Sequence, residues 1–125
     1  MVRNYIRWGA ILMLLAVALG AFGAHMLDGR IDEDMLSAYK TGVQYHIAHA
    51  LGLLIIGVLA DKLGHAKRLS LAGLFIGIGI ILFSGSLYVM ALTGVRVLGA
   101  ITPIGGVSFM IGWALLAAAA VGKRD

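Results

Sequence analysis

The sequence predicts an all-α integral membrane protein whose four transmembrane helices form one antiparallel bundle. Two observations concern composition: 61% of the 125 residues are hydrophobic and 13% are charged, whereas soluble domains are about 45–50% apolar and about 25% charged. The third observation is that the apolar residues gather in four runs, each near the roughly 20 residues that a spanning helix needs. The mean hydropathy of +0.98 agrees with a membrane location.

The four apolar runs account for most of the chain. Residues 1–125 therefore form a single transmembrane domain, because no room is left for a separate soluble domain of typical size. The predicted spans cover residues 8–27, 42–60, 69–92 and 101–121. Short, mostly polar segments connect them.

The first span allows a second interpretation. The stretch "MVRNYIRWGAILMLLAVALGAFGAH" has a basic start, an apolar centre and small residues near Gly23, as a cleaved signal peptide does. Its apolar run has the length of a membrane span, however, whereas signal peptides have a shorter apolar region. We therefore expect a transmembrane helix that is retained.

The segment between the first two spans has a helical pattern of its own. Ile31, Met35 and Tyr39 recur every four residues on either side of the acidic stretch "DED", and acidic residues favour a helix N-terminus. Two structures fit this pattern. One is a short helix that lies at the membrane interface, and the other is a straight extension of the second span.

Small residues predict where the spans pack together, because membrane helices associate by close approach of their backbones. Three spans carry such residues on one face: Ala16, Gly20 and Ala24 on the first, Gly73 and Gly77 on the third, and Ser108, Gly112 and Ala119 on the fourth. We expect Gly77 and Gly112 in particular to lie at helix–helix contacts in a tight four-helix bundle.

The basic residues predict the orientation in the membrane. Seven Lys and Arg residues fall on one side of the predicted topology and three on the other, which by the positive-inside rule makes both termini cytoplasmic. The seven are Arg3, Arg7, Lys62, Lys67, Arg68, Lys123 and Arg124, and the three are Arg30, Lys40 and Arg96. The sequence pI of about 9.8 comes from these clusters at span ends, so no nucleic-acid partner is expected.

Polar residues from all four spans fall in the outer half of the membrane. These candidate ligand-binding residues are His25, Gln44, His46, His49, Ser84, Ser86, Tyr88 and Thr102. Histidine and glutamine inside a membrane usually face the bundle interior and find partners there. We therefore expect His49, and also His46, to face inward and contact the third span near Ser84 to Tyr88.

Several roles are open to these residues. Their hydrogen bonds can simply hold helices together. His25, His46 and His49 are candidate ligands for a metal such as zinc, with Asp28 or Asp32 as a fourth, and an axial histidine can hold haem. The site can also hold a small ligand between helices, such as a lipid headgroup or a quinone.

Catalysis is not favoured by the sequence. It contains no cysteine, which excludes thiolate chemistry and disulfides. Ser84 and Ser86 lack a nucleophile-elbow pattern around them. Two function classes are left: a small binding bundle, or a structural subunit. The structural subunit would work as a homo-oligomer or dock onto a larger membrane complex.

Four motifs resemble one known family over nearly the whole chain. "GAFGAH", "YHIAHALGLL", "FSGSLYVMALTG" and "GAITPIGGVSFMIGW" occur in that order and are similar to the bacterial membrane family called domain of unknown function 423, which has relatives in animal mitochondria. The resemblance implies a four-span protein of the bacterial inner membrane and no particular activity. The family-like positions are His25, His49, Ser84, Gly85, Ser86, Tyr88, Thr102, Pro103, Gly105 and Gly106; "HALGLL" departs at Gly52 from the usual "HALALL".

Overall fold

The computed structural model of the chain describes residues 2–63 and 66–121. Lys123 and Arg124, which enter the charge asymmetry above, lie outside the described residues. The described segments are helical, with the following elements: α1 Val2–Phe22, η1 Gly23–Leu27, α2 Glu33–Leu63, α3 Ala66–Gly79, η2 Ile80–Ser84, α4 Gly85–Thr93, η3 Arg96–Ala100 and α5 Thr102–Val121. They form four helical rods long and apolar enough to cross a membrane, which confirms the predicted fold class.

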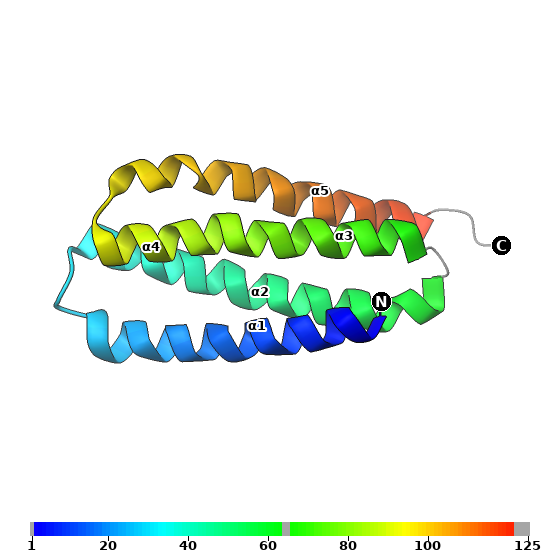
Figure 1. Cartoon of the computed structure of the whole chain (residues 1–125), viewed down its shortest axis with the longest axis horizontal. Coiled ribbons are helices and arrows are strands. Elements are labelled where there is room, and N and C mark those ends of the chain that lie inside the picture. The colour runs from blue at the N-terminus through cyan, green and yellow to red at the C-terminus, as the bar shows by residue number, and fades with distance from the viewer. Residues whose placement is uncertain (1, 64–65, 122–125) are drawn as a thin grey trace.

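The rods run side by side and alternate in direction (Figure 1). The first rod, α1 with η1, packs along α2, whereas α5 packs along the third rod, which consists of α3, η2 and α4. The second rod, α2, contacts both the first rod and the third. Residues 28–32 and the connection from α4 to α5 lie at the same end of the bundle, which we call the acidic-loop end.

Helix α2 begins at Glu33, so the acidic segment is an extension of the second span. Glu33 and Asp34 occupy its first turn, where carboxylates interact favourably with the helix dipole. The helix has 31 residues, or about 46 Å, against a hydrocarbon thickness of about 30 Å. A separate interfacial helix is therefore not formed, because Met35 and Tyr39 continue the same helix that crosses the membrane.

The third rod contains one π-helical turn, η2, in which the main-chain N–H of Gly85 bonds to the carbonyl of Ile80. The wider turn adds a residue and rotates the face of the helix that follows. Ile80 and Ser84 are consequently buried, while Ile81 is exposed.

The predicted helix–helix contact of Gly77 is wrong, since a methyl group added there would meet nothing within 4 Å.

Two glycines of α5 allow the third and fourth rods to approach closely. A methyl group on Gly105 would lie 2.3 Å from the main-chain nitrogen of Phe83, so the two backbones touch at this point. At Gly112 the added carbon would lie 2.8 Å from Ile76 and 3.1 Å from the carbonyl oxygen of Ala72. The predicted helix contact at Gly112 is confirmed.

The apolar core consists of two clusters, one toward each end of the bundle. The cluster nearer the acidic loop contains Leu27, Met35, Leu36, Tyr39, Leu87, Met90 and Ala91. The other contains Leu53, Ile56, Leu69, Ala72, Ile76, Ile80, Phe109 and Ala119. The buried polar residues His46, His49 and Ser84 lie between these two clusters along their helices.

Candidate functional site

Several polar side chains on α2, the third rod and α5 form hydrogen bonds between rods, and we call them the polar layer: His46, His49, Ser84, Ser86, Tyr88, Thr102, Ser108 and Trp113. His46 on α2 lies opposite Tyr88 on α4, with its Nδ1 2.7 Å from the Tyr88 hydroxyl. The His46 side chain is buried, and its Nε2 has no hydrogen-bond partner. The main chain of Leu12 on α1 faces the His46 imidazole.

His49 is held at both ring nitrogens. Its Nδ1 lies 2.7 Å from the carbonyl oxygen of Tyr45, one turn earlier in α2, and so donates to it. This tautomer leaves Nε2 as an acceptor, and Nε2 receives the indole N–H of Trp113 at 2.9 Å. The imidazole also stacks on Phe109, with the ring centres 3.6 Å apart.

The inward orientation predicted for His49 is therefore confirmed, but its hydrogen bonds go to α2 and α5 and not to the third span. The partners of His49 are Phe109 and Trp113 on α5. His46 instead reaches the third rod, through Tyr88. The two histidines are three residues apart in α2, which separates their side chains by about 60° around the helix, and each faces a different neighbouring rod.

The hydroxyl groups of the layer also bridge rods. Ser84 is fully buried and donates to the carbonyl oxygen of Gly42 on α2 at 2.7 Å. Ser86 on α4 lies 2.6 Å from the hydroxyl of Thr102 at the start of α5. Further along α5, Ser108 donates to the carbonyl oxygen of Phe75 at 2.7 Å. Each of these three hydrogen bonds therefore joins two neighbouring rods.

Two tyrosines attach α1 to the rest of the bundle. The hydroxyl of Tyr39 on α2 donates to the carbonyl oxygen of Leu19 at 2.5 Å. Near the opposite end, the hydroxyl of Tyr5 donates to the carbonyl oxygen of Ser70 on α3. Tyr39 fits against Gly23 and Tyr5 against Gly73, since a methyl group on either glycine would lie 2.5 Å from the ring.

Two of the candidate residues lie apart from the polar layer. Gln44 is exposed on α2, and His25 is exposed in η1 near the acidic-loop end. Among residues 2–63 and 66–121, no three His, Asp or Glu side chains stand close enough to hold a metal ion. The three-histidine arrangement considered for His25, His46 and His49 is therefore not formed.

In chemical terms the layer is almost saturated with internal hydrogen bonds. Ser84 and Ser86 donate to main-chain or hydroxyl oxygens, and neither forms a hydrogen bond with a histidine. A serine nucleophile needs an adjacent base, so the geometry does not support acyl-transfer chemistry. In the described part of the chain, His46 Nε2 is the one buried side-chain nitrogen or oxygen without a partner.

The aromatic partners of His49, Phe109 and Trp113, are not among the site residues predicted from the sequence. Trp113 lies four residues after Phe109, and helical side chains lean toward the N-terminus of their helix. The Trp113 indole therefore reaches back toward the level at which Phe109 packs on the imidazole. A signal for it was present, because a tryptophan N–H inside a membrane span needs an acceptor.

Comparisons with known proteins agree with the membrane architecture. The model of a family described as "Protein of unknown function (DUF423)" matches residues 19–106. The UPF0382 membrane protein YwdK of Bacillus subtilis is 53% identical over 119 residues, which cover 95% of this chain and 97% of that protein. The UPF0382 membrane protein SH2409 of Staphylococcus haemolyticus is 44% identical over 114 residues, covering 91% of this chain and 92% of that protein.

No solved structure matches the chain. The family match covers more than half of the sequence and includes His25, the α2 histidines and the serines of the third rod. The relatives are called membrane proteins, which agrees with four rods long and apolar enough to cross a membrane. By this match and these identities, the chain belongs to the DUF423 family of membrane proteins.

Proposed function

We propose that the protein is a structural subunit of the bacterial inner membrane that docks onto a larger membrane complex. The observation that carries the proposal is the bonding of the polar layer. The side chains of His49, Ser84 and Ser108 each bridge two rods, so the layer fixes the packing of the bundle. A bundle whose buried polar side chains are, in the described residues, almost all hydrogen-bonded within the bundle is better suited to assembly than to chemistry.

The docking surface in this proposal is an apolar groove between α1 and α3, with a volume of about 360 Å³. It is lined by Tyr5, Trp8, Leu12, Leu53, Gly73, Leu74, Gly77, Ile78 and Ile81. We call it the α1–α3 groove. It exists because α1 packs mainly on α2 and meets α3 through Tyr5 near one end.

We assign the groove to a transmembrane helix of the partner. Gly77 lies in the groove wall with open space beside it, and helices in membranes associate where a small residue lets two backbones approach. The other lining residues are almost entirely apolar, which matches the lipid-facing surface of a second helix. Lipid chains and a second copy of this chain are the competing occupants.

Photo-crosslinking in intact cells tests the proposal. A photoreactive phenylalanine analogue at Ile78, in the groove, should give a covalent adduct with another membrane protein. The matched control is the same analogue at Val107, an exposed apolar position on α5. Equal adducts from both positions, or adducts to lipid alone, would contradict docking in the groove. An adduct between two differently tagged copies of this chain would show that the partner is a second copy, in a homo-oligomer, and not a larger complex.

We also propose that both termini face the cytoplasm, with the acidic-loop end outside. Arg7 lies near the start of α1 and Lys67 and Arg68 lie at the start of α3, at the same end of the bundle, and the positive-inside rule assigns that end to the cytoplasm. Arg30 and Lys40 lie toward the other end, beside the acidic residues of the loop. Acidic residues contribute little to orientation, so the proposal depends on the basic residues.

A second candidate function is supported by His46. Its unpartnered Nε2 is buried beside α1, where a buried polar atom without a partner is costly. A small ligand with a hydrogen-bond acceptor, such as a quinone or a lipid headgroup, would supply that partner if it entered between α1 and α2. Mass spectrometry and metal analysis of gently purified protein should then find a bound species. His46→Leu should release it, whereas Gln44→Leu, on the exposed face, should not.

A further inference from the structure

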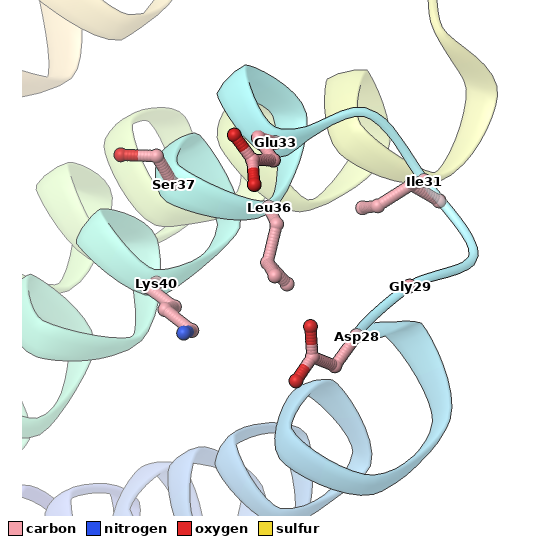
Figure 2. Close-up of a pocket in the computed structure, with 7 residues that line it drawn as sticks. All are labelled: Asp28, Gly29, Ile31, Glu33, Leu36, Ser37 and Lys40. Atoms are coloured by element: carbon pink, nitrogen blue, oxygen red, sulfur yellow. The ribbon is translucent and has the colours of Figure 1, made fainter.

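A second cavity lies outside the polar layer, at the acidic-loop end. It occupies the space between the loop after η1 and the first turns of α2, with a volume of about 440 Å³. Its lining residues are Asp28, Gly29, Ile31, Glu33, Leu36, Ser37 and Lys40 (Figure 2). We call it the loop pocket. Asp28 on the loop and Lys40 on α2 project from opposite sides of it.

The loop pocket contains two carboxylates and one ammonium that are not paired with each other. Asp28, Glu33 and Lys40 make no ion pair within the described residues, whereas Arg96 pairs with Asp34 at 2.9 Å and lies 3.9 Å from Asp32. The four acidic residues of this region are thus divided into two groups. Arg96 pairs with Asp34 and lies near Asp32. Asp28 and Glu33 line the loop pocket.

The walls of the loop pocket are set by the backbone. Gly29 has φ +82°, a conformation that favours glycine, and the N–H of Arg30 bonds to the carbonyl of Leu27 at 2.8 Å. This turn places Asp28 across from α2. On the α2 side, the N–H of Leu36 bonds to the carbonyl of Asp32 at 2.9 Å, which holds the first turn that carries Glu33.

The charges select the chemical class of the ligand. A primary ammonium group donates several hydrogen bonds, and two carboxylates are suitable acceptors for it. Lys40 attracts a phosphate as a point charge, and it also repels a bare metal ion. No three metal-ligating side chains meet among residues 2–63 and 66–121. A ligand with an ammonium and a phosphate a few bonds apart therefore fits better than a metal.

We propose that the loop pocket binds the phosphoethanolamine group, with its ammonium between Asp28 and Glu33 and its phosphate at Lys40. This inference is independent of the groove between α1 and α3. The pocket lies at one end of the rods, between the loop after η1 and the first turns of α2, and Ile31 and Leu36 give it an apolar side. Lipid headgroups lie at the ends of membrane-spanning helices, because the hydrocarbon core is only about 30 Å thick. The same group occurs on a zwitterionic phospholipid and as free phosphoethanolamine.

Native mass spectrometry of the purified protein tests the assignment. The protein would be given equal amounts of palmitoyl-oleoyl phosphatidylethanolamine, phosphatidylglycerol and phosphatidylcholine. Phosphatidylethanolamine should be retained best, because glycerol carries no cation and the choline nitrogen has no N–H to donate. Asp28→Asn and Lys40→Gln should each reduce its retention about tenfold, the change expected for one lost charge-assisted hydrogen bond.

Asp32→Asn is the matched control, because it removes the same charge four residues from Asp28 but on the Arg96 side. It should leave retention unchanged. Equal retention of the three lipids, or equal losses in Asp28→Asn and Asp32→Asn, would overturn the proposal. Free phosphoethanolamine added to the same protein distinguishes the sources: thermal stabilisation that depends on Asp28 identifies a soluble ligand, and its absence together with lipid selectivity identifies the phospholipid.

Discussion

The indole N–H of Trp113 donates a hydrogen bond to Nε2 of His49 across the contact between α5 and α2, at 2.9 Å. Because Nδ1 of His49 donates to the Tyr45 carbonyl, this one bond completes the pairing of a buried imidazole. It also defines which nitrogen carries the proton. The rotation of α5 relative to α2 is therefore specified by a directional bond in addition to apolar packing.

Removing this bond should destabilise the bundle modestly. Trp113→Phe keeps an aromatic ring but leaves His49 Nε2 without a donor, and we expect a loss of about 1 kcal/mol, the size of interhelical hydrogen bonds in membranes. Unfolding in a detergent titration measures it. Trp8→Phe is the control, because Trp8 is 53% exposed and makes no hydrogen bond among the described residues. Equal losses in both variants would show that the bond to His49 contributes nothing.

The close approach at Gly105 should be intolerant of any side chain. Gly105→Ala places a carbon 2.3 Å from the Phe83 nitrogen, and because both groups belong to backbones the rods must separate, at a cost of about 1–3 kcal/mol or more. Gly77→Ala meets nothing within 4 Å and should change stability by less than about 0.5 kcal/mol. A thermal melt in one detergent compares the two variants, and a larger loss at Gly77 would contradict the close contact at Gly105.

The His46–Tyr88 pair should show energetic coupling. Tyr88→Phe removes the hydroxyl and leaves His46 Nδ1 unpaired, while His46→Leu leaves the tyrosine hydroxyl unpaired. The double variant removes both groups, so its loss of stability should be smaller than the sum of the single losses by about 0.5–1.5 kcal/mol. Tyr45→Phe is the control partner, since the Tyr45 hydroxyl makes no hydrogen bond among the described residues and should show no coupling to His46.

The proposed orientation predicts which cysteines an impermeant thiol reagent can label in intact cells. The natural sequence has no cysteine, so each substitution reports on a single position. Glu33→Cys, at the acidic-loop end, should be labelled without lysis, and Lys67→Cys should be labelled only after lysis. Both side chains are exposed, so a lack of labelling cannot be caused by burial of the cysteine within the protein. The reverse pattern would place the termini outside.

The sequence by itself determined the fold class. In lipid every backbone N–H and C=O must be bonded within the protein, and a single apolar run satisfies this only as a helix. Four runs of spanning length therefore give four helical rods, whatever their neighbours are. The burial of His46 and His49 follows from similar reasoning, because an imidazole in the membrane needs partners that lipid does not supply.

The third rod shows what only the tertiary structure decided. A straight α-helix would keep Gly73, Gly77, Ile81 and Ser84 near one face. The π-turn at Ile80–Ser84 changes that register, so Ser84 faces inward while Ile81 and Gly77 face outward or into the groove. Within this turn Phe83 lies at the close backbone approach to Gly105 of α5, and a π-turn has no local sequence signal as clear as proline.

The choice of hydrogen-bond partners was likewise decided by tertiary structure. Depth along a span can be counted from the sequence, and it placed His46 and His49 beside the hydroxyls of the third span. The rotation of each helix about its own axis cannot be derived from the sequence in this way, because it depends on how all four rods pack together. That rotation turned His46 toward Tyr88 and His49 toward Trp113, and it left Gln44, two residues from His46 on the same helix, exposed.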